Sequence, residues 1–231
     1  MKIALVISGQ PRMVNEAYNN IKLNFLDPYS PDVFIHTWVN PEDFSKSTKN
    51  SWGSGNFTYD QNIVGNIYSK YLPKKSYFEN QIDLTSSLPK SLNKKYHFNM
   101  ASMLYSMDKA NSLKTSYEIE NNFVYDCVIR YRFDLNIFCK EPIKLDELDL
   151  SNTIYCLNDC SHYNGVNDQF AIGNSKNIDI FSSSYQNIKE FSKNYKNHCQ
   201  LVCGETIVYY STWLKNQITL DYIPYDYTLL R

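Results

Sequence analysis

The first 40 residues alternate between two kinds of apolar pattern, and this alternation restricts the fold more than any other feature of the sequence. Residues 3–7 form a short apolar run that is followed by Gly9 and Pro11, and residues 32–38 form a second run. Between the two, residues 13–25 place apolar side chains at helical spacing. A strand, a helix and a strand in so short a segment predict a βαβ unit with parallel strands and a right-handed crossover.

The same alternation continues along the 231 residues of the chain. It predicts further helices at 63–71, 99–121, 177–196 and 204–216. It predicts further strands at 75–81, 124–137, 152–159 and 170–174, and a terminal strand or extended tail at 218–230. The Met-rich face of the predicted helix 99–121 is an expected core contact. Because no internal repeat or clean linker interrupts the pattern, we expect one α/β domain over residues 1–231 with a mixed sheet. The polar residues 42–62 are an expected mobile loop or insertion.

The charges of the chain nearly cancel, with 23 basic and 24 acidic residues. No overall charge therefore favours nucleic acid or an acidic lipid surface as a partner. The apolar run at 3–7 is too short to span a bilayer, and it lacks the cleavage site of a secretory signal. We expect a cytoplasmic protein with no transmembrane segment and no nucleic-acid partner. Peripheral association with the inner face of the membrane, through a lipid-linked acceptor, stays open, although no basic amphipathic helix indicates it.

Two cysteine pairs with four-residue spacing and two nearby histidines make a conceivable zinc set, namely Cys156, Cys160, Cys199, Cys203, His162 and His198. Neither pair has the tighter spacing that is typical of zinc fingers. In a chain that is expected to be cytoplasmic, reduced cysteines are favoured over disulfides or structural zinc.

Three charged residues interrupt the apolar segment YDCVIRYRFDLNI, which covers residues 125–137 and reads as a buried strand. Arg130, Arg132 and Asp134 have period two, so all three side chains project from one face of the strand. Two interpretations stay open. The three groups satisfy one another as an ion-pair ladder, or the arginines bind a diphosphate while Asp134 binds a divalent cation or a sugar hydroxyl.

Polar residues gather at the ends of several predicted strands. In open α/β sheets, ligands bind beyond the carboxyl ends of the strands. The polar residues concerned are Ser8, Gly9, Arg12, His36, Trp38, Arg130, Arg132, Asp134, Asn167, Asp168 and Gln169. This convergence predicts a binding or catalytic site at one edge of the sheet.

Several of these residues, and Glu205 as well, also have a purely structural interpretation. The segment SGQPR is either a simple turn with Gly9 at an unusual backbone angle, or a phosphate site before a helix; it matches neither a Walker loop nor a dinucleotide fingerprint. His36 is a hydrogen-bonded core histidine or a site residue. Asp168 caps a turn or holds sugar hydroxyls. Glu205 opens a predicted helix, where the helix dipole favours an acid, or belongs to an active site.

Four sequence blocks, KIALVISGQPR, DVFIHTW, YDCVIRYRFDL and NDQFAIGN, resemble in order and spacing a family of small glycosyltransferase-like proteins. Members of that family occur in bacterial capsule, lipopolysaccharide and O-antigen gene clusters and in large DNA viruses. The resemblance runs from Met1 to about Glu205. It implies a single Rossmann-like GT-A domain, with a mixed, mostly parallel sheet, helices on both faces, and a nucleotide sugar across the carboxyl edge.

The resemblance also implies roles for individual residues. The family's Asp-x-Asp element binds Mn²⁺ or Mg²⁺ with the sugar diphosphate, and Asp134 stands at its place, with Asn136 where a second acid is usual. This departure leaves the metal dependence open. NDQF is similar to the Asp-Gln element of glycogenin-like retaining transferases, which implies that Asp168 and Gln169 border the sugar and the acceptor. Glu205 is the implied base if the reaction inverts configuration.

The sequence thus predicts a glycosyltransferase that moves a sugar from a nucleotide-sugar donor to a surface-polysaccharide or other glycan acceptor. The expected donor-binding residues are Ser8, Gly9, Arg12, His36, Arg130, Arg132, Asp134 and Gln169, and the expected catalytic residues are Asp168 and Glu205. The segment 42–62 is an expected lid. Two alternatives are transfer of another activated phosphate-bearing group onto a polysaccharide, and a non-catalytic module that binds nucleotide or carbohydrate. Donor, acceptor, stereochemical outcome and oligomeric state stay open.

Overall fold

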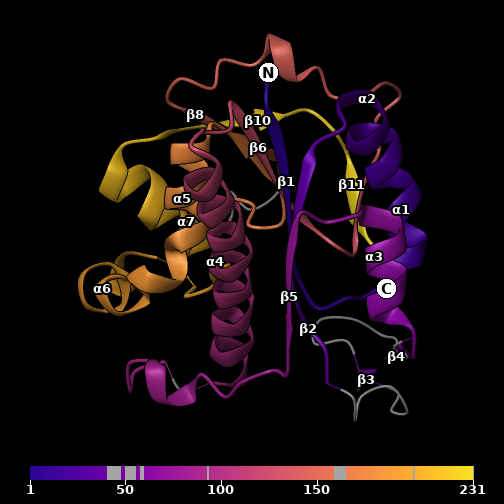
Figure 1. The fold of residues 1–231 in the computed structure, drawn as a ribbon. Helices are drawn as coiled ribbons and strands as arrows, with labels where there is room; N and C mark the ends of the chain where they lie inside the picture. The colour runs from indigo at the N-terminus through magenta and orange to yellow at the C-terminus, as the bar shows by residue number, and fades with distance from the viewer. Residues whose placement is uncertain are drawn as a thin grey trace.

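A twisted sheet of seven strands forms the centre of the molecule (Figure 1). The computed structural model describes residues 1–40, 48–49, 56–57, 60–92, 94–158, 165–199 and 201–230. The order across the sheet is β10-β8-β9-β6-β1-β2-β5. These strands are β1 (Ile3–Gly9), β2 (Asp32–Trp38), β5 (Lys75–Glu79), β6 (Cys127–Arg132), β8 (Thr153–Leu157), β9 (Ala171–Gly173) and β10 (Thr219–Ile223).

The sheet is mostly parallel. Strand β9 runs antiparallel to its neighbours β6 and β8, and the other pairings are parallel. From β1 the chain first adds β2 and β5 on one side and then returns to add β6 on the other. The strand order therefore reverses between β1 and β6, and such a switch point leaves a crevice at the carboxyl ends of the two strands.

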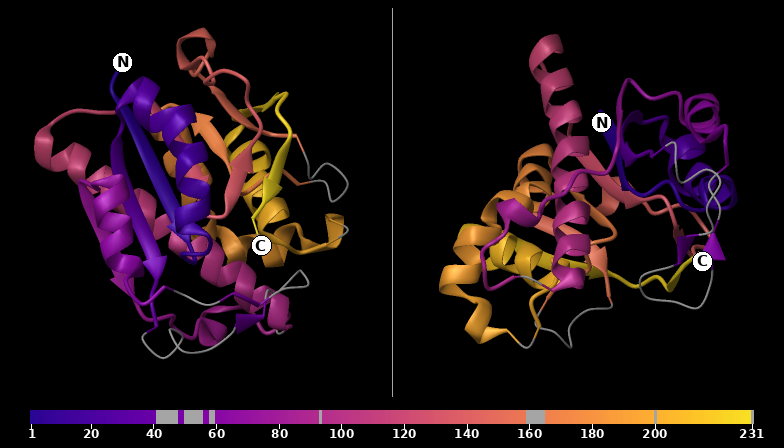
Figure 2. Two further views of the ribbon diagram at one scale, coloured as in Figure 1. Left: turned by 90° about the vertical axis from the view of Figure 1, so that its right-hand side faces the viewer. Right: turned by 90° about the horizontal axis from the view of Figure 1, so that it is seen from below.

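Helices cover both faces of this sheet, as Figures 1 and 2 show. One face carries α1 (Val14–Ile21), α2 (Asp27–Tyr29) and α3 (Ile63–Tyr71), and the other carries α4 (Lys95–Asn121), α5 (Ser175–Ser182), α6 (Ile188–Asn194) and α7 (Gly204–Tyr209). Each layer has its own apolar core, because successive residues of a strand point to opposite faces. Leu5 and Ile7 pack in the core under α1 and α3, whereas Ala4 and Val6 pack under α4. The expected α/β class and two-sided arrangement are confirmed.

Two predicted strands are in fact divided. The segment 124–137 forms β6 and then β7 (Leu135–Ile137), with a turn at Phe133 and Asp134 between them. The segment 218–230 forms β10 and then β11 (Tyr227–Leu229). Strand β11 leaves the central sheet and pairs antiparallel with β7. The first apolar pattern continues across the break because Leu135 and Ile137 are again buried, whereas Tyr227 and Leu229 of β11 are half-buried.

The helices also differ from their predicted bounds. The expected helix 177–196 is interrupted by a 3₁₀ stretch at Ser183–Asn187, between α5 and α6. Helix α4 starts at Lys95, earlier than predicted, and α3 matches its predicted range. The expected lid at 42–62 lies largely outside the described residues, which there include only the short antiparallel pair β3 (Thr48–Lys49) and β4 (Asn56–Phe57) and residues 60–62.

Helix α4 contributes most to positioning the site. Its buried stripe starts with apolar side chains, including those of Met100, Leu104 and Met107, which confirms the core role of the Met-rich face. Further along the helix the same stripe carries Lys114 and Glu118, whose Nζ and Oε2 atoms lie 2.9 Å apart. The first half of α4 thus packs on the strand ends, and the second half holds a buried ion pair.

Candidate functional site

The turn after β1 requires a glycine. Gly9 has a φ of +116°, a backbone conformation that residues with a Cβ rarely adopt. Its N–H donates to Ser106 Oγ of α4 at 2.9 Å, and its carbonyl accepts from Thr37 Oγ1 at 2.6 Å. The side chain of Arg132 lies above its Cα, because a Cβ at Gly9 would come within 3.9 Å of Arg132 Cγ. The backbone of this turn and the aliphatic part of the Arg132 side chain therefore meet at the end of β1.

A buried hydrogen-bond chain holds this turn in place. His36 is fully buried, with Nδ1 2.7 Å from Ser106 Oγ and Nε2 2.9 Å from Glu79 Oε1. Burial lowers the pKa of His36 despite the opposing effect of Glu79, so the imidazole is neutral at pH 7. Since the carboxylate of Glu79 only accepts, Nε2–H donates to it and Nδ1 accepts from Ser106. His36 thus acts on the Gly9 turn through Ser106, in agreement with the core-histidine interpretation.

The two arginines of β6 have different environments. Arg130 is completely buried; its Nη1 donates to the Gln169 carbonyl oxygen and its Nε lies 3.3 Å from Met107 Sδ. Burial lowers its pKa to about 10, and the charge of Asp168 opposes this shift. The side chain of Arg132 keeps 24% of its exposure. Burial acts to lower the pKa of Arg132 as well, but the nearby carboxylates, with Asp134 first, raise it overall.

Arg132 and Asp134 form a two-pronged ion pair. Nε lies 2.7 Å from Oδ1, and Nη2 donates to Oδ2 at 2.8 Å. The turn that carries Asp134 is fixed from the other side by Leu230, whose N–H donates to the Asp134 carbonyl oxygen at 2.8 Å. The ion-pair interpretation therefore describes Arg132 and Asp134 in this structure, whereas Arg130 is satisfied mainly by the loop before β9. Ligand binding by these groups stays a prediction.

The loop before β9 brings Asp168 to the start of α7. Asn167 Oδ1 accepts from the N–H groups of Gln169 and Phe170, at 2.9 and 3.2 Å, which sets the loop conformation. A Cβ at Gly204, the first residue of α7, would collide with Asp168 Oδ2 and lie 2.5 Å from Met103 Cε. The carboxylate of Asp168 therefore lies directly over the Gly204 backbone, and only glycine leaves room for it.

Asp168 and Glu205 share one electrostatic environment with the arginines. The pKa of Asp168 is raised to about 7, first by burial and then by the charge of Glu205, against the opposing charges of Arg130 and Arg132. The N–H of Val166 donates to the Glu205 carbonyl oxygen at 3.2 Å, which ties the loop to α7. The structure thus brings the two expected catalytic acids together beside Arg132, although they are 37 positions apart in sequence.

Several buried polar atoms of this cluster have no hydrogen-bond partner among the described residues. Ser8 Oγ, Arg130 Nη2, Asp134 Oδ1 and Gln169 Oε1 are buried and make no hydrogen bond within the described structure; Asp134 Oδ1 is close to Arg132 Nε but not aligned with it. Strand register places Ser8 beside Arg132 on the same face. Because an unpaired buried polar group is costly, several of them at one sheet edge indicate a site that a polar ligand or water completes.

Of the other expected residues, Arg12 lies half-buried between the β1 turn and α1. Its backbone N–H donates to the Gln10 carbonyl oxygen at 2.8 Å. Sequence reasoning missed Ser106, Met107 and Gly204. The first two were hidden in a helix that reads as core, and Gly204 was visible only as a glycine beside Glu205.

The described residues fit a metal only in part. They contain no group of three His, Cys, Asp or Glu side chains that could enclose an ion. Asp134 Oδ1 offers one buried oxygen without an aligned hydrogen bond, and a divalent cation can be held by one or two carboxylates when phosphates supply other ligands. Cys156, Cys199 and Cys203 are free thiols, and Cys160 and His162 of the conceivable zinc set lie outside the described residues.

Among the described residues, no helix combines the length and the apolar character that a membrane span requires.

Three comparisons place the chain among known proteins. A sequence model described as a domain of unknown function (DUF7796) matches residues 90–206. The search of curated protein sequences finds no match. Among solved structures, core-mannan synthase A from Aspergillus fumigatus, in a Mn/GDP form, has a TM-score of 0.54 at 11% identity, over 99% of this chain and 74% of that chain.

Two further structures match with lower scores. The glycosyltransferase GlyE of Streptococcus pneumoniae has a TM-score of 0.45 at 14% identity over 97% of this chain, which spans only 45% of the length of GlyE. A glycosyltransferase involved in glycosylation of the major capsid of PBCV-1 has a TM-score of 0.45 at 6% identity, over 96% of this chain and 82% of that chain. By its sequence the chain belongs to the family described as a domain of unknown function (DUF7796), and its fold is of the GT-A type found in glycosyltransferases.

Proposed function

We propose that this protein is a glycosyltransferase that moves a sugar from a nucleotide-sugar donor to a glycan acceptor. The observation that carries the proposal is the set of buried polar atoms without a hydrogen-bond partner, on Ser8, Arg130 and Gln169, beside the Arg132–Asp134 ion pair at the strand-order switch of the sheet. The fold supports it, since core-mannan synthase A in its Mn/GDP form has a similar one. A diphosphate-linked sugar would supply both the acceptor and the donor atoms that such a set lacks.

In this proposal the donor's phosphates lie beyond the Gly9 turn. Arg132, which keeps part of its exposure, and Arg12 contact them, while Ser8 and Gly9 form the adjacent backbone. Arg130 is fully buried, so it acts by fixing the Gln169 carbonyl and by its charge. His36 acts on the Gly9 turn through Ser106.

The chemical step is attack of an acceptor hydroxyl on the anomeric carbon, with departure of the nucleoside diphosphate. Asp168 would orient the donor and the acceptor hydroxyl, and its pKa of about 7 suits a group that exchanges a proton near neutral pH. Glu205 would act as the base if configuration is inverted. Asp134 would hold a divalent cation that takes its other ligands from the phosphates and neutralises the leaving group.

A non-catalytic binding module would have no need for Asp168 and Glu205 near the arginines. Both carboxylates instead act on the charge of Arg132, which favours the enzyme. We further propose a surface polysaccharide or lipid-linked glycan as the acceptor, a cytoplasmic location that includes the inner membrane face, and a single domain over the chain.

A screen of nucleotide sugars tests the proposal directly. We expect release of the nucleoside diphosphate from at least one donor in the presence of Mn²⁺, and a slower rate after chelation with EDTA. Asp134→Asn should lower the rate by about 100-fold or more, since it removes the carboxylate that would hold the cation and that pairs with Arg132. Asp146→Asn, which changes an exposed acid on a 3₁₀ turn, is the matched control and should leave the rate unchanged.

Circular dichroism of each variant separates loss of activity from loss of fold. If Asp134→Asn does not fold, Asp168→Asn takes its place, because a neutral side chain suits that buried position. The absence of turnover with every donor, or full activity of both folded variants, would contradict the proposal. If EDTA does not affect turnover, the reaction needs no divalent cation. The guanidinium of Arg132 would then supply the positive charge that neutralises the leaving group.

A further inference from the structure

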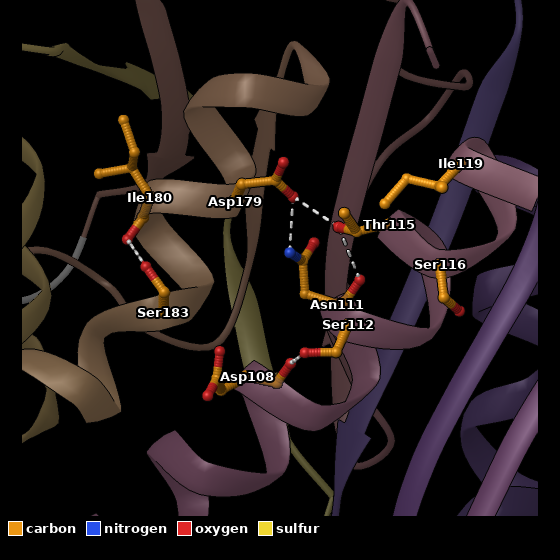
Figure 3. A pocket seen from close by; sticks show the side chains of 9 residues that line it. All are labelled: Asp108, Asn111, Ser112, Thr115, Ser116, Ile119, Asp179, Ile180 and Ser183. Atoms are coloured by element: carbon orange, nitrogen blue, oxygen red, sulfur yellow. Dashed lines mark hydrogen bonds between the residues drawn. The ribbon is translucent and has the colours of Figure 1, made fainter. Parts of the chain in front are cut away.

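An open cavity at the protein surface lies away from the strand ends, between the second half of α4 and α5 (Figure 3). Its volume is about 450 Å³, which is within the range of small-molecule sites, about 300–1,000 Å³. Asp108 and Thr115 line it from α4, and Asp179 and Ser183 line it from α5 and the 3₁₀ stretch that follows. None of its lining residues belongs to the proposed donor site.

Every side-chain hydroxyl among the described lining residues already donates its hydrogen to the protein. Ser112, Ser116 and Ser183 donate to main-chain carbonyl oxygens, at 2.8, 2.9 and 3.2 Å. Thr115 Oγ1 lies 3.2 Å from the Asn111 carbonyl oxygen and 3.1 Å from Asp179 Oδ1, and it has one hydrogen for both. What these groups still offer to a ligand is lone pairs.

The amide of Asn111 strengthens this bias toward acceptors. Its Nδ2 donates to Asp179 Oδ1 at 2.7 Å, and because a carboxylate only accepts, the amide cannot be turned around. The other end of the amide, Oδ1, is buried and finds no hydrogen-bond partner in the described part of the chain. Asn111 itself is 6% exposed. Figure 3 shows its side chain pointing between Asp179 and Thr115.

The two carboxylates of the cavity differ in how they are compensated. Asp179 Oδ1 accepts from Asn111, Thr115 and, at 2.8 Å, Lys114 Nζ, so Oδ2 is the oxygen left for a ligand. Lys114 is fully buried behind it and is shared with Glu118.

The carboxylate of Asp108 has weaker hydrogen bonds, because Gln186 Nε2 lies 3.2 Å from each of its two oxygens. Burial raises the pKa of Asp108 more than Gln186 and the charge of Lys109 lower it. The ammonium of Lys75 donates to Ser116 Oγ at 3.1 Å and is paired with Glu120 at 2.5 Å.

We propose that this cavity binds a small organic cation through a primary ammonium group. Asp108 and Asp179 Oδ2 present acceptors to one space, Asn111 Oδ1 lies buried at its edge without a hydrogen-bond partner in the described part of the chain, and the lining hydroxyls have no hydrogen left to give. An ammonium has three donors and no lone pair, so it satisfies these atoms without adding an acceptor. A neutral polyol would bring further lone pairs to a space whose hydroxyl groups already donate to the protein.

Paired ligands of equal shape test the charge requirement. Isothermal titration calorimetry at low ionic strength compares 1,4-diaminobutane with 1,4-butanediol, and glucosamine with glucose. We expect each amine to bind at least about tenfold more tightly than its neutral partner. Tighter binding of diaminobutane supports a free amine as the natural ligand, and tighter binding of glucosamine supports an amino sugar. Equal binding of an amine and its neutral partner, or no binding of either amine up to about 10 mM, would overturn the proposal.

Two substitutions at the cavity locate the binding. Asp108→Asn should weaken diaminobutane binding about tenfold, since it removes one charged acceptor. Ser112→Lys places a tethered ammonium one helical turn from Asp108 and should abolish binding, whereas Ser112→Met, of similar length but neutral, should retain it within about twofold. Ser112 is exposed, so both variants are compatible with folding. Unchanged affinity in Ser112→Lys would contradict the assignment.

The same variants separate this inference from the proposed transferase activity. Asp108 and Ser112 belong to no part of the donor site, so nucleoside diphosphate release should be unaffected by either change. Failure of amine binding would leave the transferase proposal intact, and absence of turnover would leave the amine site intact.

Discussion

Arg130 and Arg132 lie two positions apart on one strand face, yet they are held by different partners. Arg130 is enclosed by the loop before β9 and by Met107, while Arg132 faces Asp134 and keeps part of its exposure. Removing Arg130 would leave the Gln169 carbonyl oxygen without its donor and the buried charge of Asp168 less compensated, and the loss of one partner of a buried charge costs about 3–5 kcal/mol. Substitution of Arg130 therefore tests the fold, and substitution of Arg132 tests the site.

The pKa of Asp168 leads to a pH dependence of stability. In the folded protein this pKa is raised to about 7 from an ordinary value of 3.8. Between pH 3.8 and about pH 7, the folded state therefore keeps a proton on Asp168 that the unfolded state has already lost. The stability that this proton contributes disappears as the pH rises through about 7. We expect the free energy of unfolding of the wild type to fall, relative to that of Asp168→Asn, from pH 5 to pH 8.

Urea denaturation of both proteins across this pH range measures the difference directly. Parallel stability curves would show that the Asp168 carboxyl is ionised throughout, and hence that Arg130 and Arg132 outweigh both its burial and Glu205.

Single residues were only partly predictable from the sequence. The period-two spacing of Arg130 and Arg132 was enough to place both on one face, because a strand fixes the direction of its side chains. The proximity of Asp168 to Glu205 depends instead on how the loop before β9 packs on α7, through Gly165 and Gly204. No local pattern carries that information, since it is a contact between elements that are separate in sequence.

At the scale of elements, the start of α7 is the most constrained junction. Gly204→Ala should displace Asp168 and Met103, because the added Cβ has no room. We expect a loss of about 1–3 kcal/mol in stability, together with loss of donor turnover. Gly65→Ala in α3 is the matched control; its Cβ would meet only the side chain of Asn62, which is exposed and can turn away.

Chemical denaturation and the turnover assay together decide this prediction. If Gly204→Ala is as stable and as active as Gly65→Ala, Asp168 does not depend on the α7 backbone for its position.

Elements were predicted well where one periodicity persists and poorly where a chain changes partner. Helix α3 and strand β2 match their predicted ranges because their patterns end at clear breaks. The break at Phe133 and Asp134 was missed, since Leu135 and Ile137 continue the apolar alternation of β6 in a second sheet with β11. Apolar alternation reports burial and does not identify the partner strand.

At the scale of the whole molecule, ligand binding at the strand ends should stabilise both layers together. The site draws on β1, β6, α4 and α7, so a bound ligand contacts elements from across the sheet. A nucleoside diphosphate at 100 times its Kd adds about 2.7 kcal/mol, which corresponds to roughly 5–10 °C in Tm for a chain of this size.

Thermal unfolding with a nucleoside diphosphate, the monophosphate and the nucleoside checks this expectation. The shift should fall in that order, and Arg132→Lys should reduce it, because lysine cannot bind two phosphate oxygens in parallel. Equal shifts with the nucleoside alone would mean that the phosphates are not recognised.

The N–H of Leu230 supports the turn that carries Asp134, and β11 pairs with β7 directly after that turn. Residues near position 230 are translated long after those near position 134. The growing polypeptide therefore carries all of its central-sheet strands before this turn receives its last support. A released polypeptide that ends before β11 would contain every strand of the central sheet but would lack the segment that supports the Asp134 turn, so it would have the scaffold of the protein and an incomplete site.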